Sequence, residues 1–87
     1  MDVFFKGRVQ GVGFRFTTER IARQFLVHGF VENLPDGSVH LYAEGEEKDL
    51  QDFLRAVQIS KLSSYITDTE IQWGEAQGAL RDFHIRA

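Results

Sequence analysis

Residues 3–28, VFFKGRVQGVGFRFTTERIARQFLVH, contain the first predicted strand, loop and helix of this 87-residue chain. Its opening residues, Val3–Val9, are rich in β-branched and aromatic side chains, which is typical of a strand. A loop with two glycines follows at Gln10–Phe14. From Arg15 to His28 apolar residues recur at helical spacing, which predicts a helix. The apolar stripe of that helix consists of Ile21, Ala22, Phe25 and Leu26.

The ends of this helix and the next two strands follow from local signals. The pair Thr17–Thr18 is typical of a helix start, and Gly29 is typical of a helix stop. Strand patterns then occur at Phe30–Leu34 and Ser38–Glu44. The residues between them, Pro35–Gly37, favour a tight turn, so the two strands are expected to pair as a hairpin.

A second helix is predicted after Gly45, because the acidic segment Glu46–Asp49 suits the positive end of a helix dipole. Its apolar stripe consists of Leu50, Phe53, Leu54 and Val57. The remaining residues predict a polar loop at 59–64, a fourth strand at Ile66–Trp73, a loop at 74–79 and a short last strand at Asp82–Arg86.

The order of elements is β-α-β-β-α-β with a short terminal strand added. Right-handed crossovers and one hairpin convert that order into an α+β ferredoxin-like sandwich. We expect one antiparallel sheet with both helices on one face, formed by a single domain over residues 1–87. This fold carries many unrelated functions, so the chemistry must come from particular residues.

The composition excludes several classes of protein. Hydrophobic residues make up 43% and charged residues 26%, the balance of an ordinary globular domain. The absence of cysteine excludes disulfides, thiol nucleophiles and zinc–thiolate sites. No apolar run exceeds three residues, so no membrane-spanning segment is expected. With no signal peptide before the first strand, a cytoplasmic location is the expectation.

The charge is unevenly distributed along the chain. Residues 1–31 carry five cations and two carboxylates, whereas residues 32–87 carry five cations and eleven carboxylates, within an overall net charge of −3. A small anion would be attracted to the basic part, while a nucleic acid would be repelled by the rest. We therefore expect a small anionic ligand and no nucleic-acid partner.

The loop between the first strand and helix is the strongest candidate site. In Gly7–Arg15, GRVQGVGFR, the glycines at positions 11 and 13 let backbone N–H groups point inward beside a helix N-terminus. Arg15 adds a planar set of donors suited to phosphate. The residues alone leave two interpretations open: a cradle for one tetrahedral anion, or a tight turn followed by a solvated arginine. The Gly-Lys-Ser/Thr ending of a nucleotide P-loop is absent, and Phe16 stands where a dinucleotide loop needs a third small residue.

Several motifs together resemble the acylphosphatase family over nearly the whole chain. They are Gly7–Arg15, Thr18, Gly29–Gly37, Ala43–Gly45 and Asp82–Arg86. The resemblance implies a small ferredoxin-like hydrolase that cleaves the carboxyl–phosphate bond of acyl phosphates without a cofactor. No metal is expected, because the sequence has no cysteine and no spaced histidine–carboxylate ligand set. The resemblance also implies that Arg15 binds phosphate and that Asn33 orients water. The implied phosphate-binding loop consists of Gln10, Gly11, Val12, Gly13 and Phe14.

Acyl-phosphate chemistry is compatible with so simple a site. The departing carboxylate is stable near neutral pH, so catalysis needs positioning and charge stabilisation more than a strong acid. The expected ligands are a small acyl phosphate and inorganic phosphate, as product and competitive ligand, bound to a monomer. Two features depart from the family pattern. Glu32 is expected to alter the electrostatic field near the site, and the segment 59–65 is expected to differ from the family in its loop conformation.

Other interpretations of single residues remain. Asn33 precedes a turn, so it could simply shape the hairpin. His28, His40 and His84 lack metal-site spacing and are interpreted as structural or surface residues. Phe14 and Phe16 belong to the core or flank the cradle.

Two alternative functions are kept. One is a non-catalytic phosphate- or carbamoyl-phosphate-binding module resembling the first domain of hydrogenase-maturation carbamoyltransferases; the end of this chain at Ala87 is expected to separate it from those longer proteins. The other is an RNA-binding sheet, which the acidic charge and the absence of interleaved aromatics after Lys6–Gly7 disfavour.

Overall fold

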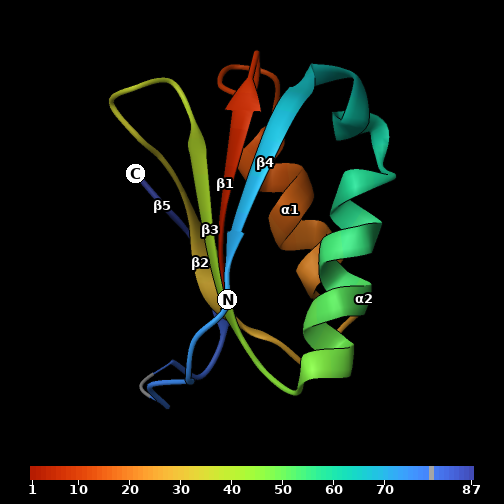
Figure 1. Cartoon of the computed structure of the whole chain (residues 1–87), viewed down its shortest axis with the longest axis vertical. Helices are drawn as coiled ribbons and strands as arrows, with labels where there is room; N and C mark the ends of the chain where they lie inside the picture. Colours follow the sequence, from red (N-terminus) through yellow and green to blue (C-terminus); the bar gives the residue numbers. More distant parts are fainter. Residues whose placement is uncertain (79) are drawn as a thin grey trace.

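The structure is a computed structural model that describes residues 1–78 and 80–87. Two helices pack on one side of a five-stranded sheet (Figure 1). The elements, in chain order, are β1 (Asp2–Gly7), α1 (Phe14–Ala22), β2 (His28–Asn33), β3 (Val39–Glu44), α2 (Glu47–Gln58), the 3₁₀ helix η1 (Lys61–Tyr65), β4 (Ile66–Gln72) and β5 (Phe83–Arg86). The predicted α+β ferredoxin-like fold is confirmed.

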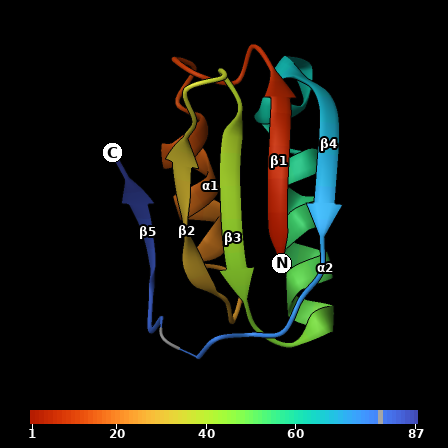
Figure 2. The same cartoon turned by 60° about the vertical axis from the view of Figure 1, so that its left-hand side comes forward.

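The sheet has the strand order β4-β1-β3-β2-β5 (Figure 2). Three pairs are antiparallel: β1 with β3, β1 with β4, and β2 with β3. The prediction of an entirely antiparallel sheet is wrong for β5, which runs parallel to β2. In Figure 2, β4 ends and β5 begins at the lower end of the sheet, on opposite edges. The last strand therefore runs opposite to β4 and in the same direction as β2.

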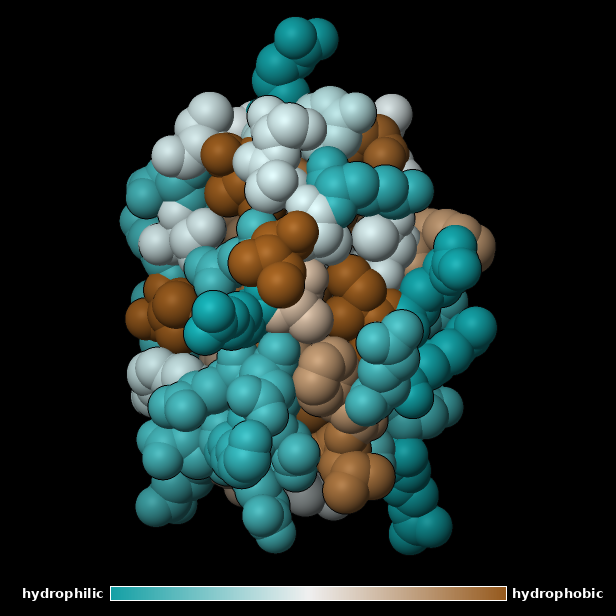
Figure 3. All heavy atoms as spheres, turned by 90° about the vertical axis from the view of Figure 1, so that its right-hand side faces the viewer, coloured by the Kyte–Doolittle hydropathy of each residue, from teal (hydrophilic) through white to brown (hydrophobic). Residues whose placement is uncertain are grey.

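The core lies between the sheet and the helices. Alternate strand residues point to that side, and Val3, Phe5 and Leu41 are completely buried there. The stripe predicted for α2 is confirmed, because Leu50, Phe53, Leu54 and Val57 are all buried. The opposite side of α2 faces solvent. Figure 3 shows that side of the molecule, where polar side chains cover much of the surface and apolar ones are visible between them.

The first helix is shorter than predicted. It begins at Phe14 and ends at Ala22, and Leu26 is 81% exposed. After Ala22 the backbone makes turn-type hydrogen bonds, Gln24 N–H to Ile21 and Phe25 N–H to Ala22. The chain must return to the sheet here to start β2, so tertiary packing overrides the apolar periodicity.

The predicted boundary residues of that helix have other roles. Gly13, in a left-handed conformation, precedes the helix, and Thr18 is completely buried one turn later. The Thr18 hydroxyl has no hydrogen-bond partner within the described residues. Gly29 is inside β2, where an added Cβ would lie 1.8 Å from the carbonyl oxygen of Tyr42. A glycine that signals a helix stop in the sequence is therefore required by strand packing.

The later elements agree more closely with prediction. The fourth strand and the last strand are confirmed to within one residue at each end. Residues 59–64, predicted to be a polar loop, contain the start of η1, because Leu62 is buried in the core and Ser60 Oγ accepts a hydrogen bond from its N–H. Residues 74–78 form no helix or strand, as predicted, and residue 79 lies outside the described residues.

No helix in residues 1–78 and 80–87 combines the length and the apolar composition that a bilayer crossing requires.

Candidate active site

The loop after β1 approaches the start of α1 with two glycines in conformations that other residues avoid. Gly11 and Gly13 have φ angles of 80° and 78°. Thr17 N–H donates to the carbonyl of Gly13 at 3.0 Å and so closes the first turn of α1. Within the described part of the chain, no backbone carbonyl accepts a hydrogen bond from the N–H groups of residues 11–16. These donors, at the positive end of a helix dipole, remain available to an anion.

Arg15 lies in the first turn of α1 and reaches the end of the chain. Its Nη1 donates a hydrogen bond to the backbone carbonyl of Arg86 in β5, 2.9 Å away. The contact links two parts of the protein that are 71 residues apart in sequence. It occupies one of the five N–H donors of the guanidinium, so others remain for a ligand.

Asn33 is the last residue of β2, is half-buried, and lies directly before the turn of the β2–β3 hairpin. The prediction of a strand-end position is therefore confirmed. Asn33 also lines a cavity of about 180 Å³ together with Gly11, Gly13 and Arg15. Its position at the end of β2 therefore places Asn33 beside the glycine loop and the start of α1. Val9, Phe14, Phe16 and Ile85 complete the lining.

Gln10 connects the loop to the hairpin. Its Nε2 donates to the backbone carbonyls of Leu34, at 2.8 Å, and Ser38, at 2.9 Å. Both donors of the side chain are therefore in use. Gln10 belongs to the predicted phosphate-binding loop, but its side chain connects the loop to the segment that follows Asn33.

The hairpin itself is held by Asp36. Its carboxylate accepts hydrogen bonds from the Ser38 hydroxyl, at 2.6 Å, and from the Ser38 backbone N–H, at 2.9 Å. The bond from the hydroxyl and then that from the backbone hold the pKa of the Asp36 carboxyl below its usual value. The ionised form of the Asp36 carboxyl therefore stabilises the turn.

Glu32 points to the opposite face of the sheet from Asn33, since successive strand residues alternate. Its Oε2 lies 2.9 Å from Nδ1 of His40, and Nε2 of that ring lies 2.7 Å from Asp2. The His40 ring also stacks on Phe4, with centroids 4.6 Å apart. Glu32, where the sequence departs from the family pattern, therefore belongs to a side-chain network across β2, β3 and β1. It does not line the cavity.

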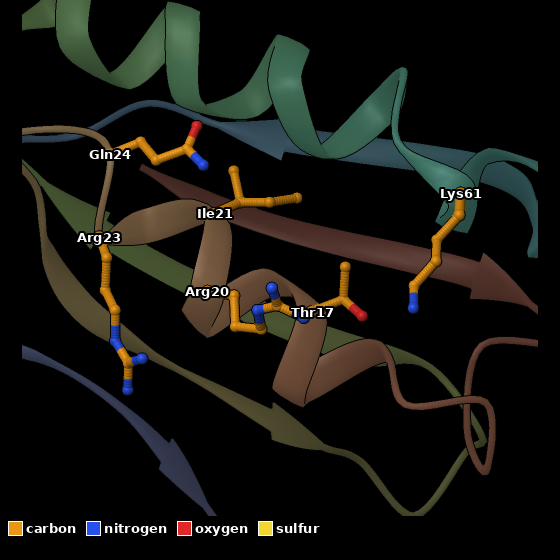
Figure 4. A pocket seen from close by; sticks show the side chains of 6 residues that line it. All are labelled: Thr17, Arg20, Ile21, Arg23, Gln24 and Lys61. Carbon is orange, nitrogen blue, oxygen red and sulfur yellow. The ribbon is translucent and has the colours of Figure 1, made fainter.

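A larger cavity, of about 270 Å³, lies on another side of α1 (Figure 4). Its lining includes the cations Arg20, Arg23 and Lys61, and Lys61 reaches from η1 toward α1. Arg23 is paired with Glu19 at 3.4 Å. This cavity is lined neither by the glycine loop nor by Asn33, so it lacks the backbone N–H groups at the start of α1.

The structure brings most of the predicted site residues together. Gly11, Gly13, Phe14, Arg15 and Asn33 line one cavity, whereas Gln10 and Val12 do not line it. Phe14 is buried, and Phe16 is exposed at the cavity. Sequence reasoning missed Val9 and Ile85. Nothing in the pattern around Ile85 indicates that the last strand would lie beside the first loop.

Comparison with known proteins assigns the family. The family model described as Acylphosphatase matches residues 1–85. The chain belongs to the acylphosphatase family. A curated acylphosphatase of Archaeoglobus fulgidus is 42% identical over 77 residues, which are 88% of this chain and 86% of the relative.

Solved structures support the same conclusion. The crystal structure of acylphosphatase from Bacillus subtilis superposes with a TM-score of 0.89 at 35% identity, over 99% of this chain and 96% of that one. The crystal structure of HypF from T. kodakarensis matches with a TM-score of 0.84 at 31% identity, over 99% of this chain but only 11% of that one. The acylphosphatase fold therefore also occurs as a small part of a longer chain.

Proposed function

We propose that this protein hydrolyses the carboxyl–phosphate bond of small acyl phosphates. The observation that carries the proposal is that the glycine loop, Arg15 and Asn33 line one cavity in a chain of the acylphosphatase family. The loop N–H groups and Arg15 bind the phosphoryl oxygens. Asn33 holds the attacking water.

The proposed reaction needs no protein nucleophile. The water oxygen attacks phosphorus, and the bond from phosphorus to the carboxyl oxygen breaks with its electron pair staying on the carboxylate. One proton of the water ends on a phosphoryl oxygen, so the products are a carboxylate and dihydrogen phosphate. Charge on the equatorial oxygens is stabilised by donors already in position, which is the main requirement of phosphoryl transfer.

Purified protein tests the proposal directly with benzoyl phosphate. We expect release of benzoate and inorganic phosphate in equal amounts, with inorganic phosphate acting as a competitive inhibitor. Arg15→Gln and Asn33→Ala serve as controls for contaminating phosphatases. Turnover that persists unchanged in both variants would refute the assignment of this cavity as the active site.

The match to HypF favours a second candidate, a phosphate- or carbamoyl-phosphate-binding module. This candidate predicts that the protein binds inorganic phosphate or carbamoyl phosphate without hydrolysing benzoyl phosphate. Binding measured by calorimetry beside turnover separates the two functions.

We further propose that residues 1–87 act as one domain and as a cytoplasmic monomer without metal, cofactor or nucleic-acid partner. The participation of strands from both ends of the chain in one sheet supports the single domain. The absence of cysteine is compatible with a reducing compartment. Light scattering at several concentrations should return the 10.0 kDa of one chain.

A further inference from the structure

Two apolar side chains are exposed at the cavity that contains Arg15 and Asn33. Phe16 is 58% exposed and Ile85 is 37% exposed, and both line that cavity. Exposed apolar residues are common on protein surfaces when they are isolated. Here two of them from different elements, α1 and β5, border the same small cavity.

A hydrogen bond between Arg15 and Arg86 connects the elements that carry Phe16 and Ile85. Phe16 follows Arg15 in α1, and Ile85 precedes Arg86 in β5. The bond of 2.9 Å from the Arg15 guanidinium to the Arg86 carbonyl therefore joins the two elements that carry these apolar residues. The arrangement places an apolar surface beside the group proposed to bind phosphate.

Neighbouring residues contact the Phe16 ring and add apolar lining to the cavity. The guanidinium carbon of Arg20 lies 5.7 Å from the centroid of the Phe16 ring, so a cation–π contact restrains the ring. Val9 and Phe14, which are buried, contribute further apolar lining. The cavity thus combines polar groups that suit a phosphoryl group with apolar groups that have no role in binding one.

We propose that Phe16 and Ile85 bind the acyl group of the substrate and make this protein favour acyl phosphates with apolar acyl groups. The inference rests on the proposed function. In an acyl phosphate a single oxygen joins the acyl carbon to phosphorus, so the acyl group stays close to the phosphoryl group and within reach of the apolar side chains that line the same cavity. A cavity of about 180 Å³ is smaller than the roughly 300–1,000 Å³ of sites for drug-sized ligands, which fits a small substrate.

The test compares benzoyl phosphate with acetyl phosphate, which share the phosphoryl group and differ in apolar area. We expect wild-type kcat/KM to be higher for benzoyl phosphate. Phe16→Ala and Ile85→Thr should each lower the benzoyl-to-acetyl ratio about 5- to 20-fold, within the range that one or two apolar groups contribute to discrimination. The inhibition constant of inorganic phosphate should stay the same, because phosphate carries no acyl group.

Leu26→Ala is the matched control. Leu26 is an exposed apolar residue outside this cavity, so its loss should leave the ratio at the wild-type value. Equal losses for both substrates in Phe16→Ala and in Ile85→Thr would overturn the proposal, since they would show a general structural effect. A changed ratio in Leu26→Ala would overturn it as well.

A binding measurement separates this inference from the proposed function. Benzoylphosphonate and acetylphosphonate carry a direct carbon–phosphorus bond in place of the C–O–P linkage, so calorimetry reports affinity without turnover. Tighter binding of benzoylphosphonate, lost in Phe16→Ala, supports the apolar subsite even if the protein hydrolyses nothing. Equal affinity of the wild type for both phosphonates refutes the subsite, whatever the outcome of the hydrolysis assay.

Discussion

The side-chain amide of Gln10 donates a hydrogen bond to the backbone carbonyl of Leu34, 2.8 Å away. A second bond runs from the same Nε2 to the carbonyl of Ser38, at 2.9 Å. Leu34 and Ser38 are themselves joined by a backbone hydrogen bond of 2.9 Å. The glycine loop is thereby fixed to the base of the hairpin that carries Asn33, so Gln10 sets the separation of the two parts of the site.

Replacing Gln10 with methionine should loosen this connection, because methionine has a similar length and no donor. We expect the free energy of unfolding to fall by about 1–2 kcal/mol for the two lost bonds. We also expect kcat to fall more than phosphate affinity does, since Asn33 would be less well aligned. Thermal melts, kcat and phosphate inhibition on the same preparation give all three values.

Gln10→Glu is the sharper variant. At neutral pH its carboxylate would face two carbonyl oxygens and repel them, so this variant should be less stable than Gln10→Met. Protonation of the glutamate at acidic pH restores a donor, so the difference in stability between Gln10→Glu and Gln10→Met should then become smaller. A Gln10→Met protein with wild-type stability and kcat would contradict the connecting role.

The sequence allowed the fold and the main site residues to be predicted because the signals for them are local. The alternation of strand residues, the stripe Leu50–Val57 and the glycines around Val12 each act within a few residues. The family resemblance added roles for Arg15 and Asn33 that local patterns leave undecided.

Features that depend on contacts between distant segments could not be predicted. The early end of α1 and the strand role of Gly29 depend on packing against the sheet. The parallel direction of β5 depends on the path of the chain after β4. The contact of Arg15 with Arg86, and hence the position of Ile85 at the cavity, spans nearly the whole sequence.

Arg15→Gln should weaken phosphate binding. Loss of charge-assisted hydrogen bonds worth about 1.5–3 kcal/mol should raise KM for an acyl phosphate and the phosphate inhibition constant roughly 10- to 150-fold. Arg15→Lys keeps the charge without the planar donor set, so its KM and its phosphate inhibition constant should lie between those of Arg15→Gln and the wild type. Unchanged phosphate inhibition in Arg15→Gln would remove Arg15 from the binding site.

The pH dependence of stability should reveal the Tyr42–Glu44 pair. The hydroxyl of Tyr42 donates to the carboxylate of Glu44, which also accepts from the Gln77 backbone N–H at 2.6 Å. The hydrogen bond from Tyr42, followed by that from Gln77, lowers the pKa of Glu44. Burial, with a further contribution from the bond to Glu44, raises the pKa of Tyr42 to about 12.

The sign of the effect follows from the depressed pKa of Glu44. Its stabilisation is complete above the unfolded-state pKa and is lost as the pH falls through the lower folded-state pKa. Tyr42→Phe removes the donor, so it should melt below the wild type at neutral pH. The difference in melting temperature should shrink as the pH falls from about 6 to about 3. A difference that stays constant over this range would contradict the pairing.

Hydrolysis should survive removal of divalent metals. The proposed charge stabilisation comes from backbone N–H groups and Arg15, and among residues 1–78 and 80–87 no group of three or more His, Cys, Asp or Glu side chains is arranged so that it could hold a metal ion. Dialysis against EDTA should therefore leave kcat unchanged. Loss of turnover that Mg²⁺ restores would show that the proposed mechanism is wrong.

Asn33→Ala should separate binding from chemistry. If Asn33 holds the attacking water, the phosphate-binding groups stay intact without it, so inorganic phosphate should inhibit almost as it does in the wild type. Turnover should fall about 10²- to 10³-fold, the scale on which one positioned polar group acts in a transition state. A purely structural asparagine at the end of β2 predicts instead a lower melting temperature with a modest change in kcat. Measuring kcat, phosphate inhibition and melting temperature on one preparation distinguishes the two roles, and a near-normal kcat would refute the water-holding role of Asn33.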